Sequence, residues 1–118
     1  MSRARFLLFA LGLAVVTSAF GTACKKSPPP AEGRELFASV CSRCHGADGS
    51  GGLPVFDGGP SPRNFRDHAF QTSRSDADLV QAIRNGKGAA MPPFGTTFND
   101  AQIAALVAQI RSFDPENK

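Results

Sequence analysis

The hydrophobic positions at the start of the chain form one uninterrupted run. Residues 6–16 are apolar, follow Arg3 and Arg5, and lead through small residues to Ala23. A short basic segment, an apolar core and small residues are typical of a secretory signal, and the run is too short to span a membrane. We therefore expect residues 1–23 to be a signal peptide and the protein to be exported.

The next hydrophobic pattern has helical spacing and contains two of the three cysteines. From Glu32 to Cys44, the side chains that share one face are at positions 36, 37, 40, 41 and 44. This spacing predicts a helix, which Gly46 ends. The glycine-rich sequence GADGSGG then predicts a turn.

Two further helices are predicted towards the C-terminus. Ser75 and Asp78 form a capping pair before the apolar positions 79, 80 and 83, and Gly86 ends this helix. Asn99 can cap the last helix with Gln102, and apolar side chains recur at 103, 106, 107, 110 and 113.

The segments between these helices have no clear period. Residues 53–73 and 87–98 contain several prolines and glycines and predict irregular loops. A loop as long as the first is uncommon in a small domain unless it wraps around something. With no strand pattern, the expected fold class is all-α, with one domain over residues 32–114 and a tail over 115–118.

Cys24 stands directly after the signal, in the sequence FGTAC. This junction resembles the lipobox of bacterial lipoproteins, in which the cysteine becomes the acylated first residue, although Gly21 stands where that motif has a larger aliphatic residue. Ordinary cleavage after Ala23 also fits. Residues 24–31 are polar and proline-rich, which predicts an extended tether. The resemblance implies a periplasmic lipoprotein, and Lys25 after the cysteine favours the outer membrane.

Removal of the signal changes the charge balance. Of thirteen Lys and Arg, Arg3 and Arg5 leave with the signal, so eleven remain against ten Asp and Glu. A formal charge of +1 does not favour nucleic acid as a partner.

The sequence CSRCH, residues 41–45, carries the candidate chemistry. A redox dithiol would favour a strand before the motif, and none is predicted. A structural zinc site needs four ligands, and His68 is the only other histidine of the chain. C-x-x-C-H is the signature of covalent haem attachment. Cysteines three apart share one helix face, so both can reach one edge of a porphyrin.

With this motif near the start of the domain, residues 32–114 resemble the small monohaem c-type cytochromes. In that family an N-terminal and a C-terminal helix cross at a glycine, with an aromatic residue four positions later; Gly33 and Phe37 match this pattern. The C-terminal helix of the family carries an aromatic residue where this chain has Gln109, with Phe113 one turn later. The resemblance implies one covalent haem c, attached through Cys41 and Cys44, with His45 on the iron.

The second iron ligand is expected to be Met91. It is the single methionine after the signal and lies in GAAMPPFG, between two predicted helices. The distal methionine of the family lies in such a loop. A lone methionine that fills core space is the alternative for Met91, and His68 is the rival ligand, with a solvated surface histidine as the simpler interpretation.

Other residues are expected around the haem. The resemblance implies that a loop proline offers its carbonyl to the second nitrogen of His45. Pro62 matches best, with Pro54 and Pro60 left open. Polar residues that could meet the propionates are Arg63, Asn64 and Arg66. Aromatic residues expected to line the pocket are Phe56, Phe65, Phe70, Phe94 and Phe98.

These features favour an electron carrier of the bacterial cell envelope, whose iron cycles between ferrous and ferric. We expect that the protein is not an enzyme. Its expected partners are redox proteins that dock at the haem edge. The alternative is a peroxidase or gas sensor with an open sixth iron position. An accessory subunit of a larger oxidase or reductase would have the same chemistry as the carrier and differ only in its partner.

Overall fold

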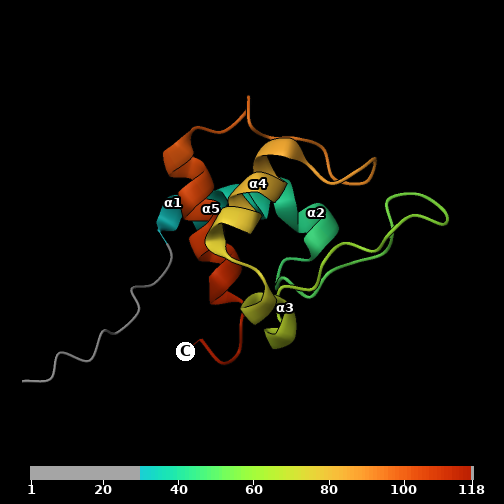
Figure 1. Ribbon diagram of the computed structural model, residues 1–118, viewed down its shortest axis with the longest axis horizontal. Coiled ribbons are helices and arrows are strands. Elements are labelled where there is room, and N and C mark those ends of the chain that lie inside the picture. The colour runs from blue at the N-terminus through green and yellow to red at the C-terminus, as the bar shows by residue number, and fades with distance from the viewer. Residues whose placement is uncertain (1–29, 118) are drawn as a thin grey trace, which may run out of the picture.

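The computed structural model describes residues 30–117 (Figure 1). The predicted signal peptide, Cys24 and nearly all of the predicted tether lie outside these residues. Within them the chain is helical and forms no strand. None of the helices in this part of the chain has the length and apolar character needed to cross a membrane.

The first helical segment runs without a break through the cysteine motif. It consists of α1, Ala31–Leu36, a π-helical segment η1, Phe37–Cys41, and α2, Ser42–His45. Gly46, with φ 78°, ends it as predicted. The helix begins one residue before the predicted domain boundary at residue 32.

Three more helices follow, of which one was not predicted. They are α3, His68–Ser73, α4, Asp76–Asn85, and α5, Asp100–Ser112. Both predicted capping boxes are present, Ser75 with Asp78 and Asn99 with Gln102. The irregular loop predicted over 53–73 is wrong at its end, because the Asp67 side chain accepts from the backbone N–H groups of residues 69 and 70 and starts α3.

The core forms where α1 and α4 pack on α5. A Cβ added to Gly33 would collide with the backbone carbonyl of Ala105, so glycine lets α1 and α5 cross in direct contact. One turn along, the rings of Phe37 and Phe113 lie with centroids 4.8 Å apart. Phe113 therefore supplies the aromatic contact with Phe37 across the two helices, while Gln109 is buried without being aromatic.

Two irregular segments complete the molecule. The proximal loop, residues 46–67, follows His45 and projects beside α2, and the distal loop, residues 86–99, joins α4 to α5 (Figure 1).

Candidate functional site

Cys41 and Cys44 are free and half-buried on the first helical segment. Burial, with a smaller contribution from the neighbouring Cys44, raises the pKa of the Cys41 thiol to about 11. A dithiol redox centre needs a thiol whose pKa is lowered. The environment of Cys41 therefore favours a residue that is capped by a covalent bond over one that exchanges disulfides. The π-helical segment that ends at Cys41 is a distortion often found at functional sites.

His45 is held by two contacts from the proximal loop. Its Nδ1 lies 3.0 Å from the carbonyl oxygen of Arg63, and its ring stacks on that of Phe65 with centroids 4.5 Å apart and planes at 20°. Because a carbonyl can only accept, Nδ1 carries the proton and donates it, which leaves the Nε2 lone pair for a metal. Burial lowers the pKa of His45, partly offset by this hydrogen bond. The neutral, ligating form is therefore favoured.

The expected role of Pro62 as the acceptor is wrong by one residue. The carbonyl that faces His45 belongs to Arg63, whereas the Pro62 carbonyl is packed against Gly51, where an added Cβ would lie 2.9 Å from its oxygen. Gly51 also donates its N–H to the carbonyl of His45 at 2.8 Å. The glycine turn thus packs against the Pro62 carbonyl, and the carbonyl of the next residue, Arg63, accepts the hydrogen bond from the imidazole.

Met91 is positioned by the backbone of the distal loop. Lys87 and Met91 exchange two hydrogen bonds, Lys87 N–H to Met91 C=O at 2.9 Å and Met91 N–H to Lys87 C=O at 3.2 Å. Phe94 then donates its N–H to the carbonyl of Ile83 at 2.9 Å, which folds the loop back onto α4. The methionine is therefore fixed relative to the helix that precedes it.

His45 and Met91 line the same partly open cavity, which lies against the core. Its other lining residues are apolar apart from one thiol; they are Phe37, Cys41, Phe65, Ile83, Leu106 and Ile110. An imidazole, a thioether and apolar walls are the ligand types and surroundings of a His/Met haem. Residues 30–117 hold no cluster of three or more His, Cys, Asp or Glu that could bind a metal ion.

The expected aromatic lining is partly wrong. Phe65 lines the cavity, and Phe98 belongs to the core against which Phe70 and Phe94 pack. Phe56 is 47 % exposed, in the proximal loop with Leu53 and Val55. Because glycines on both sides let this part of the loop project, its apolar residues do not reach the core.

The polar residues of the proximal loop have partners within the protein. Arg66 pairs with Asp48 at 3.0 Å, and Asn64 accepts from the backbone N–H of Arg66 at 2.8 Å. The guanidinium of Arg63 lies over the Phe70 ring, 5.0 Å from its centroid. Their expected contacts with haem propionates stay a prediction.

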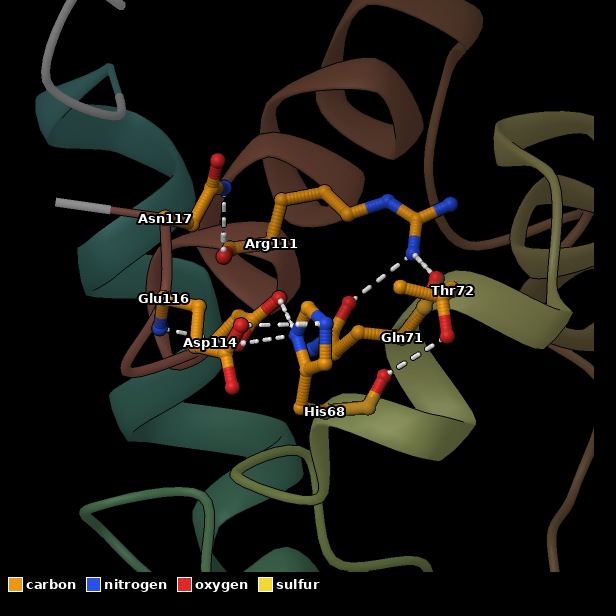
Figure 2. Close-up of a pocket in the computed structure, with 7 residues that line it drawn as sticks. All are labelled: His68, Gln71, Thr72, Arg111, Asp114, Glu116 and Asn117. Carbon is orange, nitrogen blue, oxygen red and sulfur yellow. Dashed lines mark hydrogen bonds and ion pairs between the residues drawn. The ribbon is translucent and has the colours of Figure 1, made fainter.

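His68, the rival ligand, lies at a different place. It is the first residue of α3, and Figure 2 shows it facing the segment after α5. Its Nδ1 lies 3.1 Å from the carboxylate of Asp114 and its Nε2 3.2 Å from that of Glu116. These residues line a surface pocket of about 280 Å³ that includes neither His45 nor Met91. The geometry thus favours Met91 over His68 as the second ligand.

Gln71 is a residue near the site that the sequence did not indicate. It is 5 % exposed, and its amide donates to the carbonyl of Phe65, the residue stacked on His45. It lies in a segment that showed no helical period, so no pattern marked it as buried.

The family model described as cytochrome c oxidase, cbb3-type, subunit III matches residues 28–110. The cbb3-type cytochrome c oxidase subunit FixP of Azorhizobium caulinodans is 31 % identical over 97 residues, which cover 82 % of this chain and 31 % of that protein. The chain therefore spans about a third of the length of this relative.

Two other proteins match over most of their length. Cytochrome c6 of a Picosynechococcus species is 29 % identical over 97 % of each chain. The solved structure of the KustC0563 c-type cytochrome superposes with a TM-score of 0.61 at 30 % identity, covering 70 % of this chain and 96 % of that one.

Proposed function

The chain belongs to the c-type cytochromes, in the family described as the cbb3-type cytochrome c oxidase subunit III, and we propose that it is a single-haem electron carrier of the bacterial cell envelope. Members of this family carry covalently bound haem c and act in electron transfer. The observation that carries the proposal is the apolar cavity lined by both His45 and Met91.

Cys41 and Cys44 would hold the haem through two thioether bonds. They are three residues apart and half-buried at the end of the first helical segment, one of them lining the cavity. Permanent attachment suits an exported protein, which would otherwise lose its cofactor. When bound, the haem supplies an iron that accepts and releases one electron.

His45 and Met91 would hold the iron of the haem. His45 donates Nδ1–H to Arg63 and keeps Nε2 free, while the Lys87–Met91 bridge holds the methionine backbone. Ligation by thioether and imidazole raises the reduction potential relative to two imidazoles. With both iron ligands supplied by the protein, an electron could pass without a bond between the iron and a substrate. This property would distinguish a carrier from a peroxidase or sensor.

Partners are redox proteins that dock at the haem edge. Relatives include cbb3 oxidase subunits and a cytochrome c6, so handing electrons to a larger oxidase is one form of this function. A mature charge near +1 favours a small, partly apolar contact over strong electrostatic steering.

The domain is held at the outer membrane by an acylated Cys24, with residues 24–31 as the tether. The lipobox resemblance supports this anchor. The intact mass of the protein extracted from membranes would carry the added acyl groups, and Cys24→Ser would release an unmodified protein. An unacylated wild-type protein would contradict the anchor and leave the carrier function standing.

The absorption spectrum of the ferric holoprotein tests the carrier function. We expect the weak long-wavelength band that arises from methionine sulfur on ferric iron. Met91→Leu removes the sulfur at similar volume and abolishes the band. Ile83→Val, which trims another residue of the same cavity, is the matched control and keeps it. A high-spin wild-type spectrum without the band would instead show an open sixth position and favour the peroxidase or sensor.

A further inference from the structure

Gln71 lies at the centre of a buried polar network beside the site. Its Nε2 donates to two backbone carbonyls, that of Phe65 at 2.7 Å and that of Ile110 at 2.9 Å. Its Oε1 accepts from Nη1 of Arg111 at 2.8 Å, and Figure 2 shows this guanidinium pointing at Gln71. Because carbonyls only accept and a guanidinium only donates, these three partners fix the orientation of the amide.

Arg111 of α5 connects Gln71 of α3 to α4. Its Nη1 also donates to the backbone carbonyl of Gln71 at 2.7 Å, and its Nε pairs with Asp76 of α4 at 2.8 Å. The Arg111 side chain is largely buried, while Asp76 is exposed, so this pair lies at the surface end of the network. The network thus connects α3 to α5 through Gln71, and α5 to α4 through Arg111.

The carbonyl that Gln71 holds belongs to the segment that contacts His45. The Phe65 N–H donates to the carbonyl of Gly49 at 2.7 Å, so the Phe65 peptide units are fixed on both sides. The Phe65 ring stacks on His45, and the carbonyl two residues earlier, on Arg63, accepts the His45 proton. Both contacts that orient the imidazole therefore depend on where Phe65 is held.

We propose that Gln71 is a positioning residue for the axial histidine, acting through Phe65 and Arg63. The proposal rests on the function proposed above, in which His45 binds the iron. A hydrogen bond from Nδ1 makes the imidazole a more basic ligand. A more basic ligand favours ferric iron, so loosening the bond raises the reduction potential.

The test compares two buried glutamines in the holoprotein. Gln71→Leu removes the donor to Phe65 at similar size. Gln109→Leu is the matched control, because Gln109 is 8 % exposed and its Oε1 has no hydrogen-bond partner among the described residues. The midpoint potential and the solvent-exchange rate of the His45 Nδ1 proton, followed by NMR, are measured for both variants.

We expect Gln71→Leu to raise the midpoint potential and to speed exchange of the Nδ1 proton, while Gln109→Leu moves neither. The methionine band should stay in both variants, because neither residue lines the cavity. If Gln71→Leu leaves both quantities at their wild-type values, or if the two variants shift the potential equally, Gln71 does not position His45.

A second variant covers the case in which Gln71→Leu does not fold. Arg111→Lys keeps the positive charge but cannot bridge Gln71 and Asp76 as a guanidinium does. It should give a smaller upward shift of the potential and a smaller gain in exchange rate; an unchanged Nδ1 proton would overturn the proposal. A wild-type spectrum without an iron-shifted His45 resonance would refute the proposed function itself, and with it the positioning role.

Discussion

The proximal and the distal loop each hold one proposed haem ligand, His45 at the end of α2 and Met91, but they hold it by different means. In the proximal loop, side chains take part in fixing His45: the Phe65 ring stacks on it, and the buried Gln71 amide holds the Phe65 carbonyl, in addition to the hydrogen bond with the Arg63 carbonyl. In the distal loop, the hydrogen bonds that hold Met91 are backbone bonds, the pair with Lys87 and the return of Phe94 to α4, while its side chain packs against the core without a polar contact.

The difference follows from the chemistry of the two ligands. An imidazole is planar and has two distinct nitrogens, so it must be turned to a given angle and kept in one tautomer. A thioether on a flexible chain with three rotatable bonds needs only to start from the right place. We therefore expect the proximal side to be sensitive to side-chain changes and the distal side to backbone changes.

The largest expected effect comes from truncating one aromatic residue in each of the two loops. Phe65→Ala and Phe98→Ala remove rings of nearly equal burial, 7 % and 8 % exposed, and each should lower the free energy of unfolding by about 3–5 kcal/mol. Phe98 stacks on Phe94 and not on His45. Only Phe65→Ala should therefore change the NMR signals of the His45 ring. Equal changes of the His45 signals in both variants would contradict the difference between the two loops.

A backbone change in the distal loop should have a smaller effect on stability. Gly86 has φ 70° and ψ −176°, a region open almost only to glycine, and an added Cβ would collide with the carbonyl of Met91. Gly86→Ala should cost about 3 kcal/mol in denaturant unfolding and weaken the methionine band.

The matched control lies two residues later in the same loop. Gly88 also has positive φ, 56°, but an added Cβ there meets nothing within 4 Å. Gly88→Ala should cost only about 1 kcal/mol and keep the methionine band. If both variants lose the band, the contact of Gly86 with Met91 is not what holds the ligand.

The smallest expected effect concerns acid sensitivity of the proximal loop. Hydrogen bonds from the Ser50 side chain and backbone lower the pKa of the exposed Asp48 below 3.8, and Arg66 makes a smaller contribution in the same direction. A depressed pKa gives stability that is present above 3.8 and is lost as the pH falls through the lowered value. Asp48→Asn should therefore be slightly less stable than wild type at pH 7, with the difference shrinking at a pH well below 3.8.

Urea unfolding at both pH values measures this difference. Asp57→Asn, in the projecting part of the same loop, is the control and should follow the wild type at both. A constant gap between Asp48→Asn and wild type across the range would show that the charge of Asp48 is not responsible.

The local signals of the sequence were sufficient for most of the fold. Ser75 with Asp78 and Asn99 with Gln102 form the capping boxes that their spacing predicted, because a cap involves only four consecutive residues. The family was also recognisable from C-x-x-C-H alone, since covalent attachment demands that spacing. Gly33 and Phe37 indicated the helix crossing that α1 and α5 form.

Tertiary structure alone decided how the ligands are supported. The acceptor for His45 depends on how residues 62–65 lie against the glycine turn, which placed the Arg63 carbonyl where Pro62 was expected. Gln71 is buried because α3 packs beside the end of α5, and no local pattern marks a glutamine whose partners lie 6, 39 and 40 residues away. Residues next to each other in sequence fix helices and motifs, whereas carbonyl directions and buried amides are set by segments that meet only when the chain has folded.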